Sequence, residues 1–285
     1  MESVGGQAII EGVLIKKGSK VGIAVRNTKG KIITKEKTII SLTKKYKILN
    51  IPIIRGPIIL FETMSLGIKA LNDSANIAIE NNNKDEKLGT WTIISTLIFS
   101  ILFALIIFKL IPLGIAQLAS FYNSSFENKY LFNLIEGVSK FAILFLYLYL
   151  ISFMPDVKRV FQYHGAEHKV VNAYENNDLR NAQKYSRIHV RCGTSFIFFV
   201  LFVSIIVYIF LPIDVSFLAK YGLRILLLPF IAGISYELIK LSPKIEKNIF
   251  FKIILSPGLL LQQMTTREPT NDQIEVAKAA LKIVS

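Results

Sequence analysis

The sequence predicts an α-helical membrane protein with about four transmembrane helices, a small N-terminal β-containing cytoplasmic domain and a C-terminal cytoplasmic helical tail. Of its 285 residues, 52% are hydrophobic, and the formal net charge is +14. The mean hydropathy is +0.47. These values together are typical of a multispanning protein with basic loops. A single cysteine excludes a disulfide framework within the chain.

The first 50 residues are predicted to form the small β-containing domain. Their β-type runs are short and are separated by residues that favour turns, such as Asn27 and Gly30. We therefore expect a three-stranded meander, with strands from Gln7 to Ile15, from Lys20 to Arg26 and from Lys31 to Lys37.

Residues 51–90 are predicted to contain an amphipathic helix at the membrane interface. Pro57 suits the first turn of a helix, and the apolar positions from Ile58 to Ile79 are interrupted by charged residues such as Glu62 and Lys69. Such a helix is a poor independent span, so we expect it to lie on the membrane or against the helical bundle.

Residues 91–241 are predicted to be the membrane domain. They contain four apolar stretches, each close to the roughly 20 residues that a helix needs to cross about 30 Å of hydrocarbon. Burial of these stretches in a soluble core is the alternative, which their length disfavours. Lys109 lies near the end of the first stretch, and we expect its amine to extend to the interface. The stretches run from Trp91 to about Ala119, from about Leu131 to Met154, from Thr194 to Leu211 and from about Leu223 to Leu241.

The distribution of lysine and arginine predicts which side of the membrane each loop faces. The N-terminal region, the loop 155–193 and the C-terminal tail are basic, whereas the connections 120–130 and 212–222 carry a single lysine each. By the positive-inside rule, both termini and the loop 155–193 face the cytoplasm. The N-terminus lacks the pattern of a cleavable signal, so the first span is expected to direct insertion.

Residues 242–285 are predicted to form the cytoplasmic helical tail. Ser256, Pro257 and Gly258 are expected to break the chain. Thr270 and Gln273 have the spacing of a capping box, which predicts a final helix that ends at about Val284.

All the histidines and the only cysteine lie in the loop 155–193. His164 and His168 belong to an H-x-x-E-H pattern, and because they are four residues apart, their imidazoles would share one helix face and reach one ion. His189 and Cys192 lie just before the third apolar stretch and offer a further imidazole and a thiolate. These ligand types predict a Zn²⁺ site built from His164, His168, His189 and Cys192.

The sequence leaves two versions of this site open. His164 and His168 with one of His189 or Cys192 would leave a position for water, and Glu167 would then accept the proton of a water that the metal activates. All four ligands together would close the shell, as structural zinc sites do. Glu175 would lie about 10 Å from His168 along a continuous helix, too far to bind the same ion, so only a supporting or substrate-binding role is expected.

The excess positive charge is explained by the topology and by contact with anionic lipid of the bilayer. A ribosome or another nucleic-acid partner for the basic N-terminal domain is the less favoured explanation, because the sequence carries no recognisable RNA-binding signature.

Five blocks of sequence carry a resemblance to a known family. In their order along nearly the whole chain, they resemble the YqhQ-like family of bacterial membrane proteins of unknown function, which is described mainly as predicted metal-dependent enzymes. The resemblance implies a bacterial inner-membrane setting and supports metal at His164 and His168, but it supplies no substrate. The blocks are Gly5-Gly6-Gln7-Ala8 with Glu11-Gly12-Val13, Pro52 to Gly56, Tyr163 to Lys169, Arg191 to Phe196, and Pro257 to Pro269.

The sequence thus favours an integral membrane metal-binding protein that acts as a zinc-dependent hydrolase at the cytoplasmic membrane face. Glu167 would be its catalytic residue, and a membrane protein or a lipid its substrate. The alternative is a non-enzymatic factor for membrane-protein biogenesis or scaffolding, in which a structural zinc fastens the loop to the bundle. A transporter is the third reading, because Glu136, Lys140 and Glu237 are ionisable well inside apolar segments.

Overall fold

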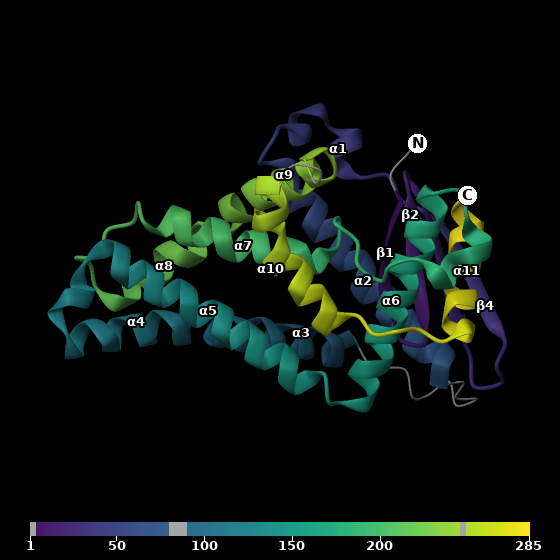
Figure 1. The fold of residues 1–285 in the computed structure, drawn as a ribbon, viewed down its shortest axis with the longest axis horizontal. Coiled ribbons are helices and arrows are strands. Elements are labelled where there is room, and N and C mark those ends of the chain that lie inside the picture. The colour runs from purple at the N-terminus through teal and green to yellow at the C-terminus, as the bar shows by residue number, and fades with distance from the viewer. Residues whose placement is uncertain (1–3, 80–89, 246–248) are drawn as a thin grey trace.

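The computed structural model describes residues 4–79, 90–245 and 249–285. Most of this chain is helical, and it is arranged as a long helical bundle with a small sheet and its covering helices at one end (Figure 1). The polar run from Asn81 to Lys87 lies outside the described residues.

The N-terminal sheet has four antiparallel strands in the order β1-β2-β3-β4, and the expected three-stranded meander is wrong in this respect. The run expected as one strand from Gln7 to Ile15 turns back at Ile10 and Glu11 instead. Glu11 has a φ of 52°, and its carboxylate pairs with Arg159. A tertiary ion pair thus holds a turn that lacks the usual glycine or asparagine. The strands are β1 (Val4–Ile9), β2 (Gly12–Lys17), β3 (Lys20–Arg26) and β4 (Ile32–Thr38).

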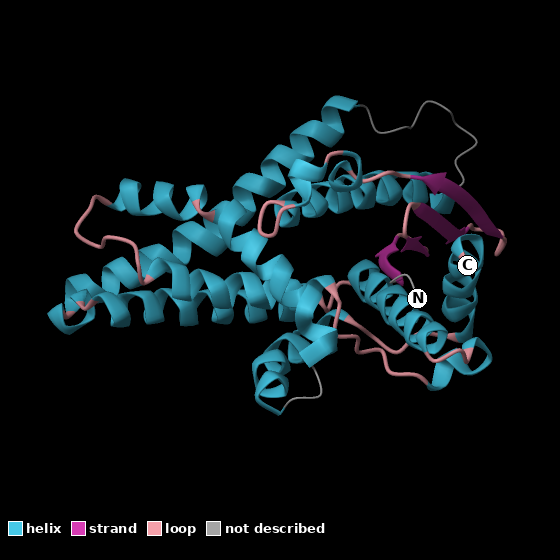
Figure 2. Ribbon diagram, turned by 90° about the horizontal axis from the view of Figure 1, so that it is seen from above, coloured by secondary structure: helices cyan, strands magenta, loops and turns pink. Residues whose placement is uncertain are grey.

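Helices cover both faces of the sheet because its buried residues alternate between the two faces. Val13 and Ile15 pack with residues of α6 (Pro155–Glu175) and α11 (Asn271–Val284) on one face. Leu14 packs with residues of α2 (Arg55–Ile79) on the other. The C-terminal helix accordingly lies beside the strands (Figure 2).

The prediction for the final helix is confirmed. The side chain of Thr270 accepts a hydrogen bond from the backbone N–H of Gln273, and the Gln273 side chain completes the capping box. Pro257, expected to break the chain, lies inside α10 instead, so that prediction is wrong. Helix α10 packs along α7, and this tertiary packing offsets the hydrogen bond that proline cannot donate.

The bundle contains two helical segments that are long and apolar enough to cross a membrane, 94–122 and 129–151, among the described residues. A third candidate is the pair α8 and α9, which is bent by 42°. Helix α7 is apolar but shorter, so the four-span arrangement stays a prediction. The elements are α3 (Thr90–Leu105), a π turn (Ile106–Leu110), α4 (Ile111–Tyr122), α5 (Lys129–Ile151), α7 (Gly193–Tyr208), α8 (Phe217–Leu226), α9 (Leu228–Ile245) and α10 (Ile249–Thr265), with short helical turns at Leu42–Lys45, Lys47–Asn50, Ser124–Glu127 and Leu179–Lys184.

Lys109 does not extend to an interface as expected. It lies within the π turn, is buried, and donates a hydrogen bond to the hydroxyl of Tyr208 at 3.1 Å. The turn precedes Pro112, which cannot donate a backbone hydrogen bond, and such one-turn π segments accommodate a break in the α-helical ladder.

Candidate metal centre

Helix α6 supplies three of the predicted site residues. Pro155 lies at its first turn with Asp156, both of which favour a helix start. The helix then passes close to the segment before α11, and a Cβ at Gly165 would lie 2.1 Å from the carbonyl oxygen of Arg267. Glycine at this position of the H-x-x-E-H pattern therefore lets the two segments approach, and His164 and His168 flank that contact.

Both histidines are oriented by backbone carbonyl groups. The Nδ1 atom of His164 lies 2.8 Å from the carbonyl oxygen of Thr265, and that of His168 lies 2.6 Å from the carbonyl oxygen of Arg187. A carbonyl oxygen only accepts, so each Nδ1 carries the proton and donates. Each Nε2 is then the unprotonated nitrogen that a metal requires, which is the usual arrangement of metal-binding histidines.

Cys192 brings a sulfur to the same place. It is the N-cap residue of α7, and its Sγ accepts from the backbone N–H of Thr194. Its Sγ lies 3.2 Å from Nε2 of His164, and one ligand atom each of His164, His168 and Cys192 lies within 4.8 Å of the others. Zinc bonds of about 2.0–2.3 Å to nitrogen and sulfur imply ligand separations of about 3–4 Å, so these donors fit a zinc ion with small adjustments.

His189 does not join this group. Its backbone N–H donates to the Gln262 side chain at 2.9 Å, and its carbonyl accepts from the same side chain at 2.8 Å. Its Nε2 lies 3.4 Å from a Glu175 carboxylate oxygen, and its Nδ1 accepts from the backbone N–H of Arg191 at 3.3 Å. The converging ligand atoms are therefore those of His164, His168 and Cys192, and the choice between the two versions left open by the sequence stays a prediction. Glu175 lies next to His189 and also pairs with Arg191.

Glu167 lines the same pocket as the histidines, and only 4% of its surface is exposed. One of its carboxylate oxygens lies 3.5 Å from Nε2 of His168. Burial raises the pKa of this carboxyl, while the nearby imidazoles of His164 and His189 and the backbone of Gly6 act in the opposite direction. Burial also lowers the pKa of His168, which favours the neutral imidazole that binds metal.

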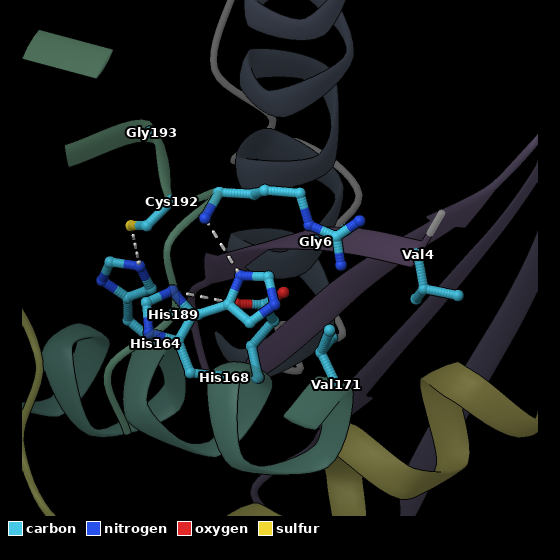
Figure 3. A pocket seen from close by; sticks show the side chains of 11 residues that line it. Val4, Gly6, His164, His168, Val171, His189, Cys192 and Gly193 are labelled. Atoms are coloured by element: carbon cyan, nitrogen blue, oxygen red, sulfur yellow. Dashed lines mark hydrogen bonds and ion pairs between the residues drawn. The ribbon is translucent and has the colours of Figure 1, made fainter. Parts of the chain in front are cut away.

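Strand β1 forms the wall opposite the histidines. A Cβ at Gly6 would lie 2.8 Å from both Cγ and Oε1 of Glu167, so glycine leaves the space that this carboxyl occupies. The pocket between β1, α6 and the segment before α7 has a volume of about 60 Å³ (Figure 3). It is large enough for an ion and a few water molecules.

Sequence reasoning missed the groups that hold these ligands. The carbonyl oxygens of Thr265 and Arg187 and the side chain of Gln262 come from segments distant from α6. Backbone carbonyls have no residue signature, and Gln262 and Thr265 belong to a sequence block that carried no chemistry of its own. The one sequence feature that could have drawn attention to Gln262 and Thr265 was their place in the block from Pro257 to Pro269.

Together these features define a predominantly helical protein with a small antiparallel sheet and a candidate metal pocket where the sheet meets the bundle. The chain belongs to the DUF1385 family, described as "Protein of unknown function", whose sequence model matches residues 51–285. It is similar to "Uncharacterized protein YqhQ" of Bacillus subtilis (strain 168), with 36% identity over 292 residues that cover 96% of this chain and 89% of the relative. The resemblance to the YqhQ-like family is thus confirmed. No solved structure matches the chain.

Proposed function

We propose that the protein is a zinc-dependent hydrolase that acts at the cytoplasmic face of the membrane. The observation that carries this proposal is the convergence of two histidine Nε2 atoms and one cysteine sulfur, with both Nδ1 atoms held by carbonyl oxygens. Three protein ligands leave a tetrahedral ion one open position, as catalytic zinc sites have. Closed structural sites use four ligands; His189 lines the same pocket, but the converging ligand atoms are those of His164, His168 and Cys192.

Zinc in this pocket would supply Lewis acidity toward water and toward the group that is cleaved. Glu167 would accept the proton of the attacking water and return it to the leaving group. Its burial and its contact with His168 keep the carboxyl next to the ligands. The small pocket would limit the access of bulk water to the reacting atoms.

The alternative function is a scaffold or biogenesis factor with a structural metal. It is favoured by the contacts of the α6 histidines with two other parts of the chain. They contact Arg187 and Cys192 in the connection before α7, and Thr265 at the end of α10. A metal would strengthen this junction between the sheet end and the bundle, whether or not it activates water.

The proposed membrane arrangement has four spans in a bacterial inner membrane, with both termini cytoplasmic. It is supported by the two long apolar helices, by the bent pair α8 and α9, and by the basic character of the N-terminal region, the loop 155–193 and the C-terminal tail. The candidate metal pocket then lies on the cytoplasmic side, where a membrane protein or a lipid is the expected substrate.

Genetic complementation with Glu167→Gln separates the enzyme from the scaffold. The change keeps the size of the side chain and removes the proton acceptor, so an enzyme should fold and retain metal yet lose biological activity. The comparison variant is Cys192→Ser, which should lower metal affinity under both readings. Full complementation by Glu167→Gln at matched membrane abundance would reject the hydrolase proposal and favour the scaffold.

A further inference from the structure

The helical bundle buries a cluster of cations. The four side chains come from the π turn after α3, from α5 and from α8, and the π turn contacts both of these helices. Helix α8 lies toward the end of the bundle away from the sheet (Figure 1). Their exposed fractions are low. They are Lys109 with 7%, Lys140 with 1%, Lys220 with 6% and Arg224 with 1%.

One carboxylate, that of Glu136, is buried with them among the described residues. Arg224 donates to both of its oxygens, the shortest contact being 2.6 Å. Lys140 lies 2.6 Å from its Oε1. Glu136 is therefore in direct contact with two cations, and its single negative charge is smaller than theirs.

The other two cations have neutral partners. Lys109 donates to the hydroxyl of Tyr208 at 3.1 Å, and Lys220 donates to the side-chain oxygen of Gln117 at 2.9 Å. Asp214 attracts Lys220 electrostatically but is itself exposed. An ammonium group has three donors, so each lysine retains unused hydrogen-bonding capacity.

Aromatic rings offset a small part of this charge. The cationic groups of Lys109, Lys140 and Arg224 lie 5.5, 4.3 and 5.0 Å from the ring centre of Tyr208. A cation near a ring is stabilised far less than a buried ion is penalised for its loss of water. Lys109 and Lys140 both lie near the ring of Tyr208, and Glu136 is the carboxylate buried with them among the described residues. An anion placed beside the ring would therefore interact with both lysines.

We propose that this cluster is a binding site for a doubly charged oxyanion of the phosphate-monoester type. With all four cationic side chains protonated, the cluster and its one carboxylate carry three net positive charges. A dianion would remove most of this excess, whereas a singly charged anion would leave two. Lysine ammonium groups are suited to phosphate oxygens as point charges with several donors. Lys109 and Lys140 would hold the oxyanion beside Tyr208, and Lys220 would neutralise its remaining charge. This site is distinct from the metal pocket and does not depend on the proposed hydrolase.

The same chemistry is available from a lipid with a phosphomonoester headgroup or from free phosphate. The test uses the full chain in phosphatidylcholine nanodiscs and measures the midpoint of thermal unfolding. One arm adds inorganic phosphate, with sodium chloride at equal ionic strength as its reference. The other replaces some phosphatidylcholine by phosphatidic acid, with phosphatidylglycerol, whose headgroup is a singly charged diester, as its reference.

The midpoint of the wild type should rise in at least one arm by more than in its reference, because an anion that binds the folded state stabilises it. A rise with inorganic phosphate identifies a site for the free anion, and a rise with phosphatidic acid alone identifies a lipid site. Lys109→Met, which keeps a similar side-chain volume without the charge, should lose this rise. The exposed Lys44 serves as control, and Lys44→Met should keep it.

Two results would overturn the proposal. One is a wild-type midpoint that neither inorganic phosphate nor phosphatidic acid raises above its reference. The other is an equal rise in Lys109→Met, which would assign the effect to another part of the molecule, such as the metal pocket. If Lys109→Met fails to accumulate, Lys220→Met replaces it in the same comparison with the same expected loss.

Discussion

Gly6 decides where the carboxyl of Glu167 can lie. A Cβ at this position would approach Glu167 Cγ to 2.8 Å and the carbonyl oxygen of Leu14 to 2.5 Å. Gly6→Ala should therefore displace Glu167 or the strand and lower the stability by about 1–3 kcal/mol, as other overpacked sites do. Biological activity should fall while metal is retained, since no metal ligand is changed.

The adjacent Gly5 is the matched control, because a Cβ there would meet nothing within 4 Å. Thermal unfolding, metal content and complementation should be close to wild type for Gly5→Ala. Equal behaviour of the Gly5 and Gly6 variants in all three measurements would contradict the role assigned to Gly6.

The raised pKa of Glu167 predicts how the stability of the metal-free protein depends on pH. The folded state favours the protonated acid, so this contribution is fully present below the unfolded pKa of about 4.3 and is lost as the pH rises through the raised value. Glu167→Gln has no such loss. Its unfolding midpoint, measured in chelator across a pH series, should rise relative to wild type as the pH increases, and parallel pH profiles would count against a buried carboxyl.

At the residue scale, the sequence indicated the candidate ligands but not the groups that orient their side chains. His164 and His168 could be paired because helical spacing is local, and Cys192 because its residue type is rare in this chain. The carbonyl oxygens of Arg187 and Thr265 are backbone atoms brought to α6 by tertiary packing, which no local pattern encodes. The position of His189 depends in the same way on Gln262.

At the scale of elements, α11 links the C-terminus to the sheet, and its capping box is a specific point of stability. Thr270→Ala removes the side-chain acceptor of the Gln273 N–H and should cost about 1 kcal/mol. Thr270→Ser keeps a hydroxyl and should cost clearly less. The midpoint of thermal unfolding measures both, and an equal loss in the two variants would show that the hydroxyl does not contribute as a cap.

The elements that sequence patterns predicted well were those with a local cause. The final helix has a capping box, and the strand from Lys20 to Arg26 was predicted with the bounds that the structure has. The turn at Glu11 could not be predicted because its positive φ is supported by the distant Arg159. The helix through Pro257 depends on packing against α7. The bend between α8 and α9 lies inside the stretch predicted as one span from about Leu223 to Leu241, where no glycine or proline signals a break before Pro229.

At the scale of the whole molecule, the basic loops predict which residues are accessible from outside the cell. In a Cys192→Ser background, an impermeant thiol reagent should label Ser125→Cys and Ser216→Cys but not Lys184→Cys, all of which replace exposed residues. Membrane disruption should make Lys184→Cys reactive, which serves as the control for exposure. Strong labelling of Lys184→Cys in intact cells would place the metal pocket on the outer side.

Elemental analysis of the purified protein tests whether the candidate metal centre binds zinc. Wild type and Glu167→Gln should contain zinc in a stoichiometric amount, because Glu167 is not among the converging ligand atoms. His164→Ala and His168→Ala should lose most of it, since each removes one of three protein ligands. Metal content that is equal in wild type and both histidine variants would contradict the claim.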